Sequence, residues 1–160
     1  MPTKTIVFGL AIFLHDLFTA AWIGGLITLG LTVMPSLKNV LEKGPQIKKI
    51  MEVIQKRQSL IVHISIIGLV VTGLLQANHN TAYLGFFNFG NTYSAVLAVK
   101  HILVMMMVVI TLYRSLALAK TSTPKQEKLK AKLLMLNIGI GTLVLLASGF
   151  ASAFSSLPLN

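Results

Sequence analysis

Long apolar runs alternate with short basic segments along this chain. Four runs approach or exceed the roughly 20 apolar residues that a helix needs to cross a hydrocarbon core about 30 Å thick. They cover residues 6–37, 59–77, 93–119 and 131–154. The first run is too long for the apolar core of a cleaved signal peptide, so we interpret it as a true span. The pattern predicts an all-α integral membrane protein, an up-down-up-down four-helix bundle forming a single domain over residues 1–160.

Composition supports this class and argues against the others. Of the 160 residues, 54% are hydrophobic and only 11% are charged, yet the formal net charge is +10. A soluble domain carries about a quarter of its residues as charges, so the chain is too apolar for a soluble globule. A nucleic-acid-binding protein needs its basic residues gathered on a solvated face, whereas here they lie in blocks between long apolar runs. The expected partner is therefore the lipid bilayer and not nucleic acid, and a homo-oligomer is compatible with the sequence.

The basic residues also predict the orientation of the spans. Segments 38–57 and 114–132 together hold 12 of the 14 lysines and arginines. Because such residues stay on the cytoplasmic side, both segments are expected in the cytoplasm and both termini outside, in a multi-pass protein of the cell membrane. Segment 38–57 alternates charged with apolar residues, which predicts an amphipathic extension on the anionic inner leaflet.

Five ionisable residues remain at membrane depth, where such groups are costly and mark functional sites. They are His15, Asp16, His63, Lys100 and His101. His15 and His101 lie about 12–14 Å below the outer boundary of their spans, counting 1.5 Å per residue. The first and third helices of the bundle are diagonal neighbours, so the two imidazoles are expected to face each other across a gap that suits a porphyrin. The chain has no cysteine, so the haem would be non-covalent and of b type.

The remaining candidates are placed around this predicted haem site. Trp22 shares a helical stripe with His15, and Lys100 has Asp16 or a haem propionate as its expected partner. His63 lies in the cytoplasmic half, where Met135 is at the same depth. It is either a structural histidine bonded to a neighbouring helix or a ligand of a second, His/Met-coordinated haem. The candidate cofactor residues are therefore His15, His101, Lys100, Trp22 and His63, with the three histidines as iron ligands.

Copper is an alternative metal, because thioether and imidazole groups bind Cu(I). The chain has seven methionines, of which Met105, Met106 and Met107 are consecutive. Consecutive residues on a helix point in different directions, so core filling explains these three better than a copper path. His79 is expected to be solvated in the outer loop.

Several motifs resemble the copper-resistance protein D superfamily, which includes the HemJ-type protoporphyrinogen oxidases. The first is LHDLFTAAWIGGLITLGLTVMPSL, with His15, Trp22, Gly25 and Pro35 at the family spacing. The segments KRQSLIVHISIIGLVVTGLL and YSAVLAVKHILVMMMVVI resemble the second and third helices, and EKLKAKLLMLNIGIGTLVLLASG is a looser match to the fourth. The resemblance implies that His15 is haem-associated and that Lys100 supports activity.

The chain departs from the oxidases after Pro35, where Ser36 and Leu37 replace their Tyr-His pair. His63 and His101 have no counterpart in the motif. The leading hypothesis is thus a b-type haem protein that transfers electrons to or from a quinol or another redox protein. Copper transport or homeostasis, and tetrapyrrole oxidation centred on His15 and Lys100, are the alternatives.

Overall fold

The computed structural model describes residues 3–40, 44–77, 83–118 and 123–155, and all regular structure in these ranges is helical. The elements are α1 (Thr3–Thr19), η1 (Ala20–Gly24), α2 (Gly25–Ile27), η2 (Thr28–Val33), α3 (Met34–Val40), α4 (Pro45–Ala77), α5 (Thr92–Leu112), η3 (Tyr113–Ala117) and α6 (Pro124–Ser155). Four continuous stretches, Thr3–Val40, Lys49–Ala77, Thr92–Ala117 and Pro124–Ser155, are long and apolar enough to cross a membrane. The predicted all-α class with four spans is confirmed.

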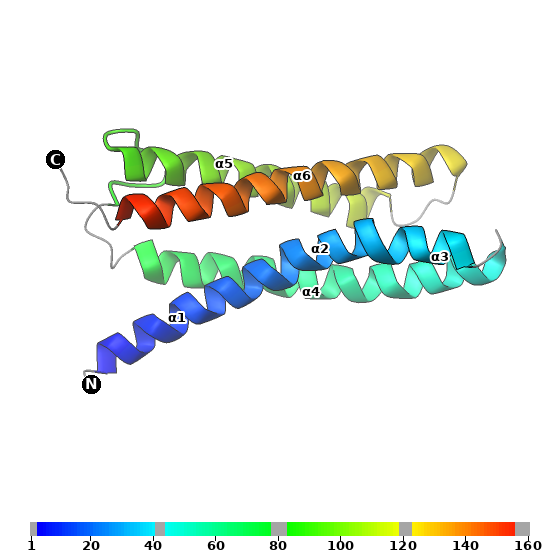
Figure 1. Ribbon diagram of the computed structural model, residues 1–160, viewed down its shortest axis with the longest axis horizontal. Helices are drawn as coiled ribbons and strands as arrows, with labels where there is room; N and C mark the ends of the chain where they lie inside the picture. Colours follow the sequence, from blue (N-terminus) through cyan, green and yellow to red (C-terminus); the bar gives the residue numbers. More distant parts are fainter. Residues whose placement is uncertain (1–2, 41–43, 78–82, 119–122, 156–160) are drawn as a thin grey trace. The chain divides into compact units, whose positions relative to one another are not determined.

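The chain forms two compact units, Met1–Gln76 and Ala77–Asn160. The first is a hairpin in which the stretch α1–α3 lies beside α4, and the second is a hairpin of α5, η3 and α6 (Figure 1). Each hairpin has the up-down path expected from the sequence. The expected union of both hairpins in a single domain stays a prediction.

The first hairpin is joined by contacts that recur along its length. Four contacts join its two stretches: Ala11 with Gln76, His15 with Thr72, Phe18 with Gly68, and Gly25 with Gln58. The numbers rise on the first stretch while they fall on α4, which defines an antiparallel pair. Two of the four contacts use a glycine, because small residues let membrane helices approach closely.

The contact between Gly68 and Phe18 leaves no room for a larger residue. A Cβ atom at position 68 would collide with the Phe18 ring. We expect Gly68→Ala to displace this ring and to destabilise the first hairpin by about 1–3 kcal/mol, the usual cost of overpacking. Unfolding by SDS in detergent micelles would measure the difference. Gly139→Ala on α6 is the matched control, since nothing lies within 4 Å of its added Cβ. Equal stabilities of the two variants would contradict the close approach.

The first stretch is not a regular α-helix. It changes to π-helical turns at η1 and again at η2, with α2 between them. A π turn shifts the hydrogen bonds to i→i+5 and occurs frequently at functional sites. The stripe that would join His15 to Trp22 on a regular helix is therefore altered by η1, which begins between them.

The described parts of the basic segments 38–57 and 114–132 are largely helical. Residues 45–57 form the first part of α4, which runs unbroken for 33 residues. At 1.5 Å per residue α4 is about 50 Å long, so it continues well past the apolar core. The predicted amphipathic extension is thus continuous with the second span. Likewise, residues 124–132 are the first turns of α6.

Both helices of the second hairpin begin with a side-chain cap. The side-chain Oδ1 of Asn91 accepts a hydrogen bond from the Ser94 backbone amide at 2.6 Å at the start of α5. At the start of α6, Thr123 and Gln126 form a capping box: the Gln126 backbone amide donates to the Thr123 Oγ1 at 3.4 Å and the Thr123 backbone amide donates to the Gln126 Oε1 at 3.3 Å. Between the helices, the buried Asn137 Nδ2 donates to the Thr111 Oγ1 at 2.9 Å. Such hydrogen bonds are typical of helix pairs in membranes.

Candidate functional site

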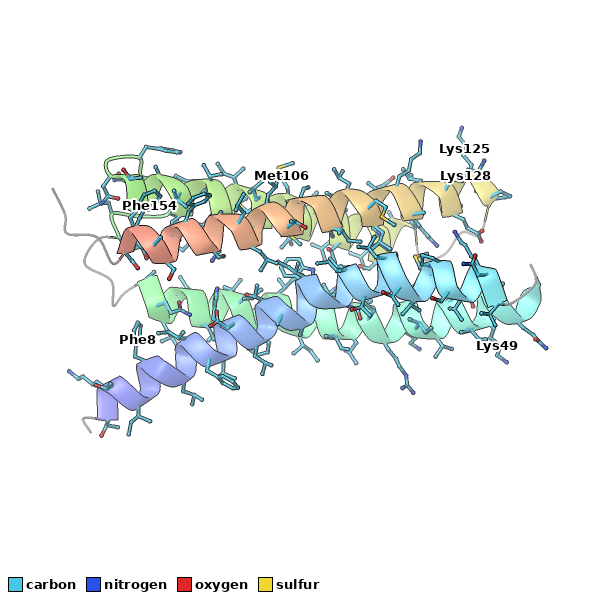
Figure 2. All side chains as sticks on the ribbon, in the orientation of Figure 1. Phe8, Lys49, Met106, Lys125, Lys128 and Phe154 are labelled. Carbon is cyan, nitrogen blue, oxygen red and sulfur yellow. The ribbon has the colours of Figure 1, made fainter. Side chains whose placement is uncertain are left out.

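His15 lies on α1 and is held from the facing helix by Thr72. Its Nδ1 is 2.9 Å from the Thr72 Oγ1, a contact between residues 57 positions apart in the sequence. The Thr72 side chain is 4% exposed, and its hydroxyl donates to the Gly68 carbonyl at 2.7 Å. Figure 2 shows the dense layer of side chains along this hairpin.

This pair of hydrogen bonds determines which ring nitrogen of His15 carries the proton. A threonine hydroxyl has one proton to donate, and the Gly68 carbonyl receives it. The His15 Nδ1 must therefore be the donor to Thr72. In the neutral imidazole the basic lone pair then lies on Nε2. In metal sites, a ligating histidine is usually oriented by a hydrogen bond of this kind from its other ring nitrogen.

The His15 ring lies close to α4 at Gly73. A Cβ atom at Gly73, the residue after Thr72, would stand 3.7 Å from the His15 Cε1, at ordinary van der Waals distance. One helical turn from His15, Phe18 packs on Gly68. The ring is thus fixed between α1 and α4 by contacts that the first hairpin provides on its own.

His101 lies on α5 in the second unit and is half-buried. Its buried Nδ1 has no hydrogen-bond partner among the described residues. The Phe86 ring lies against the imidazole at a centroid distance of 5.0 Å. An aromatic side chain from the segment before α5 therefore covers His101.

The loop that carries Phe86 is itself held on α5. The Leu84 backbone amide donates to the buried Ser94 hydroxyl at 3.1 Å, and Gly85 supplies the positive φ of 133° that the turn requires. Tyr83 contacts Phe86 edge to face at 6.0 Å. Burial raises the pKa of the Tyr83 phenol, so this aromatic cover remains uncharged at neutral pH.

His63 makes a local contact instead of an interhelical one. Its Nδ1 donates to the Ser59 carbonyl at 2.6 Å, one turn earlier on α4. The expected structural hydrogen bond is thus formed with the histidine's own helix. Met135, the partner suggested for a second haem, lies on α6 in the other unit with its side chain exposed.

The other expected site residues occupy different environments. Trp22 is 2% exposed and its indole Nε1 lacks a hydrogen-bond partner within the described ranges. Lys100 is half-buried on α5, and Asp16 is exposed on α1. Within the described ranges, no three His, Asp or Glu side chains converge as a metal-binding group. A haem requires only one or two histidines, so the candidate ligands are judged one by one.

The consecutive methionines diverge as expected from their spacing. Met105 and Met106 are 58% and 48% exposed, whereas Met107 is wholly buried. Only Met107 therefore fills the core of its unit, a usual role of methionine. His79 lies outside the described residues.

Three residues of these sites were not expected from the sequence. They are Thr72, which orients His15, Phe86, which covers His101, and Gln58, whose amide lies on Gly25. The only sequence signal for Thr72 or Gln58 is a polar residue in or beside an apolar run. Selecting their partners requires the pairing of the two helices.

Comparisons with protein-family models, with curated proteins and with solved structures give no match for this chain.

Proposed function

We propose that this protein is an integral membrane b-type haem protein that transfers electrons, with a quinol or another redox protein as its partner. The observation that carries the proposal is the fixed ring of His15. A histidine at membrane depth donates its Nδ1 proton to a buried threonine, which leaves Nε2 as the basic nitrogen. Neutral imidazole in this form is the commonest iron-binding side chain.

His15 on α1 and His101 on α5 are the residues that would hold the haem. The His101 Nδ1 is buried without a hydrogen bond, and a coordinating or hydrogen-bonding partner would remove the cost of that unpaired group. Bound haem supplies one-electron oxidation and reduction. If both histidines were to bind the iron, the group would supply electron transfer rather than oxygen chemistry.

The helices fit this role in a bilayer. All four spans expose large apolar side chains along their length, as lipid-facing helices do. We place the basic segments 38–57 and 114–132 in the cytoplasm by the positive-inside rule. His15 and His101 then lie in the outer half of the membrane, which suits exchange of electrons with a partner outside.

The absorption spectrum of the detergent-purified protein tests the proposal. Oxidised protein should show a Soret band, and reduction by dithionite should sharpen the α-band of a low-spin haem. The same preparation should bind added hemin if it was purified without the cofactor. A colourless protein that rejects hemin and binds Cu(I) would replace the haem proposal with the copper alternative.

A further inference from the structure

Arg114 is a cation without a counter-charge near the end of the third span. It lies in the π turn η3, three residues before the stretch Thr92–Ala117 ends, and its side chain is half-buried. Its Nε is buried without a hydrogen-bond partner among the described residues. Arginine stays charged in proteins, and a cation removed from water without a partner is costly. The position therefore favours the binding of an anion.

The chain itself offers few anions for this purpose. Residues 77–160, which make up the second unit, contain seven lysines and arginines but a single acidic residue, Glu127. Within the described ranges, Arg114 forms no ion pair with Glu127 or with another acidic residue. The whole chain has four acidic residues against 14 basic ones. Most of its cations must therefore find their counter-charges on other molecules.

Arg114 belongs to the face of its helix that packs within the second hairpin. Thr111, three residues earlier, and Leu118, four residues later, are both buried. Residues three and four apart share one face of a helix, so Arg114 continues this stripe. Of its three nitrogens only Nε is buried and unpaired, which leaves the two terminal nitrogens at the tip of the side chain accessible. A ligand can thus reach Arg114 from the surface of the hairpin.

A second cation, Lys130 on α6, lies close to the level of Arg114. The hydrogen bond between Asn137 and Thr111 sets the register of the two antiparallel stretches (Figure 1). Three residues beyond this bond, Arg114 comes level with the buried Leu134. Lys130 is half-buried one turn before Leu134, about 6 Å farther along the axis at 1.5 Å per residue. Its charge acts on a ligand of Arg114 even without contact, because the Debye length is about 8 Å at physiological salt.

The chemistry of the two cations selects a class of ligand. The planar guanidinium donates two parallel hydrogen bonds to a phosphate group. Arg114 lies at the end of an apolar span, where the phosphate groups of lipids are found, and basic sites between spans bind anionic lipid headgroups. A zwitterionic headgroup would bring its own ammonium group towards Lys130. A headgroup with a net negative charge has no such repulsion.

We propose that Arg114 and Lys130 form a binding site for the headgroup of an anionic phospholipid. The Arg114 guanidinium donates hydrogen bonds to the phosphate, and the charge of Lys130 favours an anionic over a zwitterionic lipid. The site lies wholly within the second unit and does not depend on the proposed haem.

Native mass spectrometry of the delipidated full-length protein in detergent tests the proposal. Dioleoyl-phosphatidylglycerol should bind with saturation, and dioleoyl-phosphatidylcholine, which has the same acyl chains, should bind about tenfold more weakly. Inorganic phosphate in excess should not displace the bound lipid, because it has no acyl chains to lie along the span. Equal binding of the two lipids, or displacement by inorganic phosphate, would overturn the assignment to an anionic lipid.

The two arginines of the chain provide a matched pair of variants. Arg114→Gln should weaken the binding of phosphatidylglycerol about tenfold, through loss of hydrogen bonds to a charged group. Arg57→Gln removes the same charge from an exposed position on α4 and should retain the affinity. Arg114→Lys keeps the charge without the planar fork, so its affinity should fall between those of Arg114→Gln and the parent protein. Equal affinities of Arg114→Gln and Arg57→Gln would show that the lipid responds only to net charge, which would refute the site.

A second pair of variants tests the choice of lipid without altering Arg114. Lys130→Gln should reduce the preference for phosphatidylglycerol over phosphatidylcholine, whereas Lys132→Gln, at an exposed position on the same helix, should not. Circular dichroism of each variant verifies that the helices are retained. If Arg114→Gln does not fold, the comparison of Lys130→Gln with Lys132→Gln still decides. Equal preferences in these two variants would contradict the role of Lys130.

Discussion

Replacing His15 with alanine is expected to remove the Soret band and the reduced α-band from the purified protein. Removing a residue that hydrogen-bonds to a metal ligand typically lowers metal affinity about 10–100-fold. Loss of the ligand itself should therefore reduce haem affinity on the order of 100-fold or more. Absorbance spectra, together with a titration of hemin into the purified variant, measure the effect.

His63→Ala is the matched control for this prediction. It removes an imidazole at membrane depth that is bonded to its own helix through the Ser59 carbonyl. We expect this variant to retain the spectrum, because the proposed site uses His15 and His101. An unchanged spectrum in His15→Ala, with loss in His63→Ala, would refute the assignment of His15 as a ligand.

Thr72→Val is expected to weaken haem binding about 10–100-fold without changing any iron ligand. Valine has nearly the shape of threonine but lacks the hydroxyl that accepts the His15 Nδ1 proton. The imidazole then loses the hydrogen bond that fixes its tautomer and orientation. Hemin titration measures the affinity.

A readout independent of haem tests the same hydrogen bond. In the protein without haem, the nitrogen chemical shifts of the His15 ring report which nitrogen is protonated, and we expect the Nδ1–H form. Thr72→Ser keeps the hydroxyl and should preserve both this form and the affinity. If valine binds haem as well as threonine does, Thr72 has only a packing role.

The sequence was most informative about the membrane spans, because the local composition alone determines which segments enter lipid. Residues that must lie in lipid form long apolar runs, and most of the lysines and arginines lie outside them. The four spans follow from this contrast, and the structure confirms them. The ends of α4 and α6 were less well predicted. Their charged first turns look like loops to a hydropathy pattern but continue the helices without a break.

Only part of the candidate site could be predicted from the sequence. His15 and His101 are conspicuous because imidazoles are rare in apolar spans. Their surroundings are less visible. Phe86 covers His101 because a turn at Gly85 folds the segment before α5 back over this helix. Nothing in the spacing of the aromatic residues distinguishes Phe86 from its neighbour Phe87.

The sequence by itself determined the number of spans and the short set of ionisable residues within them. Only the tertiary structure decided that His15 pairs with Thr72, that Gln58 lies on Gly25 and that π turns interrupt the first span. The physical reason is that lipid tails are as apolar as the side chains between helices. The hydrophobic pattern therefore identifies what enters the membrane, whereas close packing and interhelical hydrogen bonds select which faces meet.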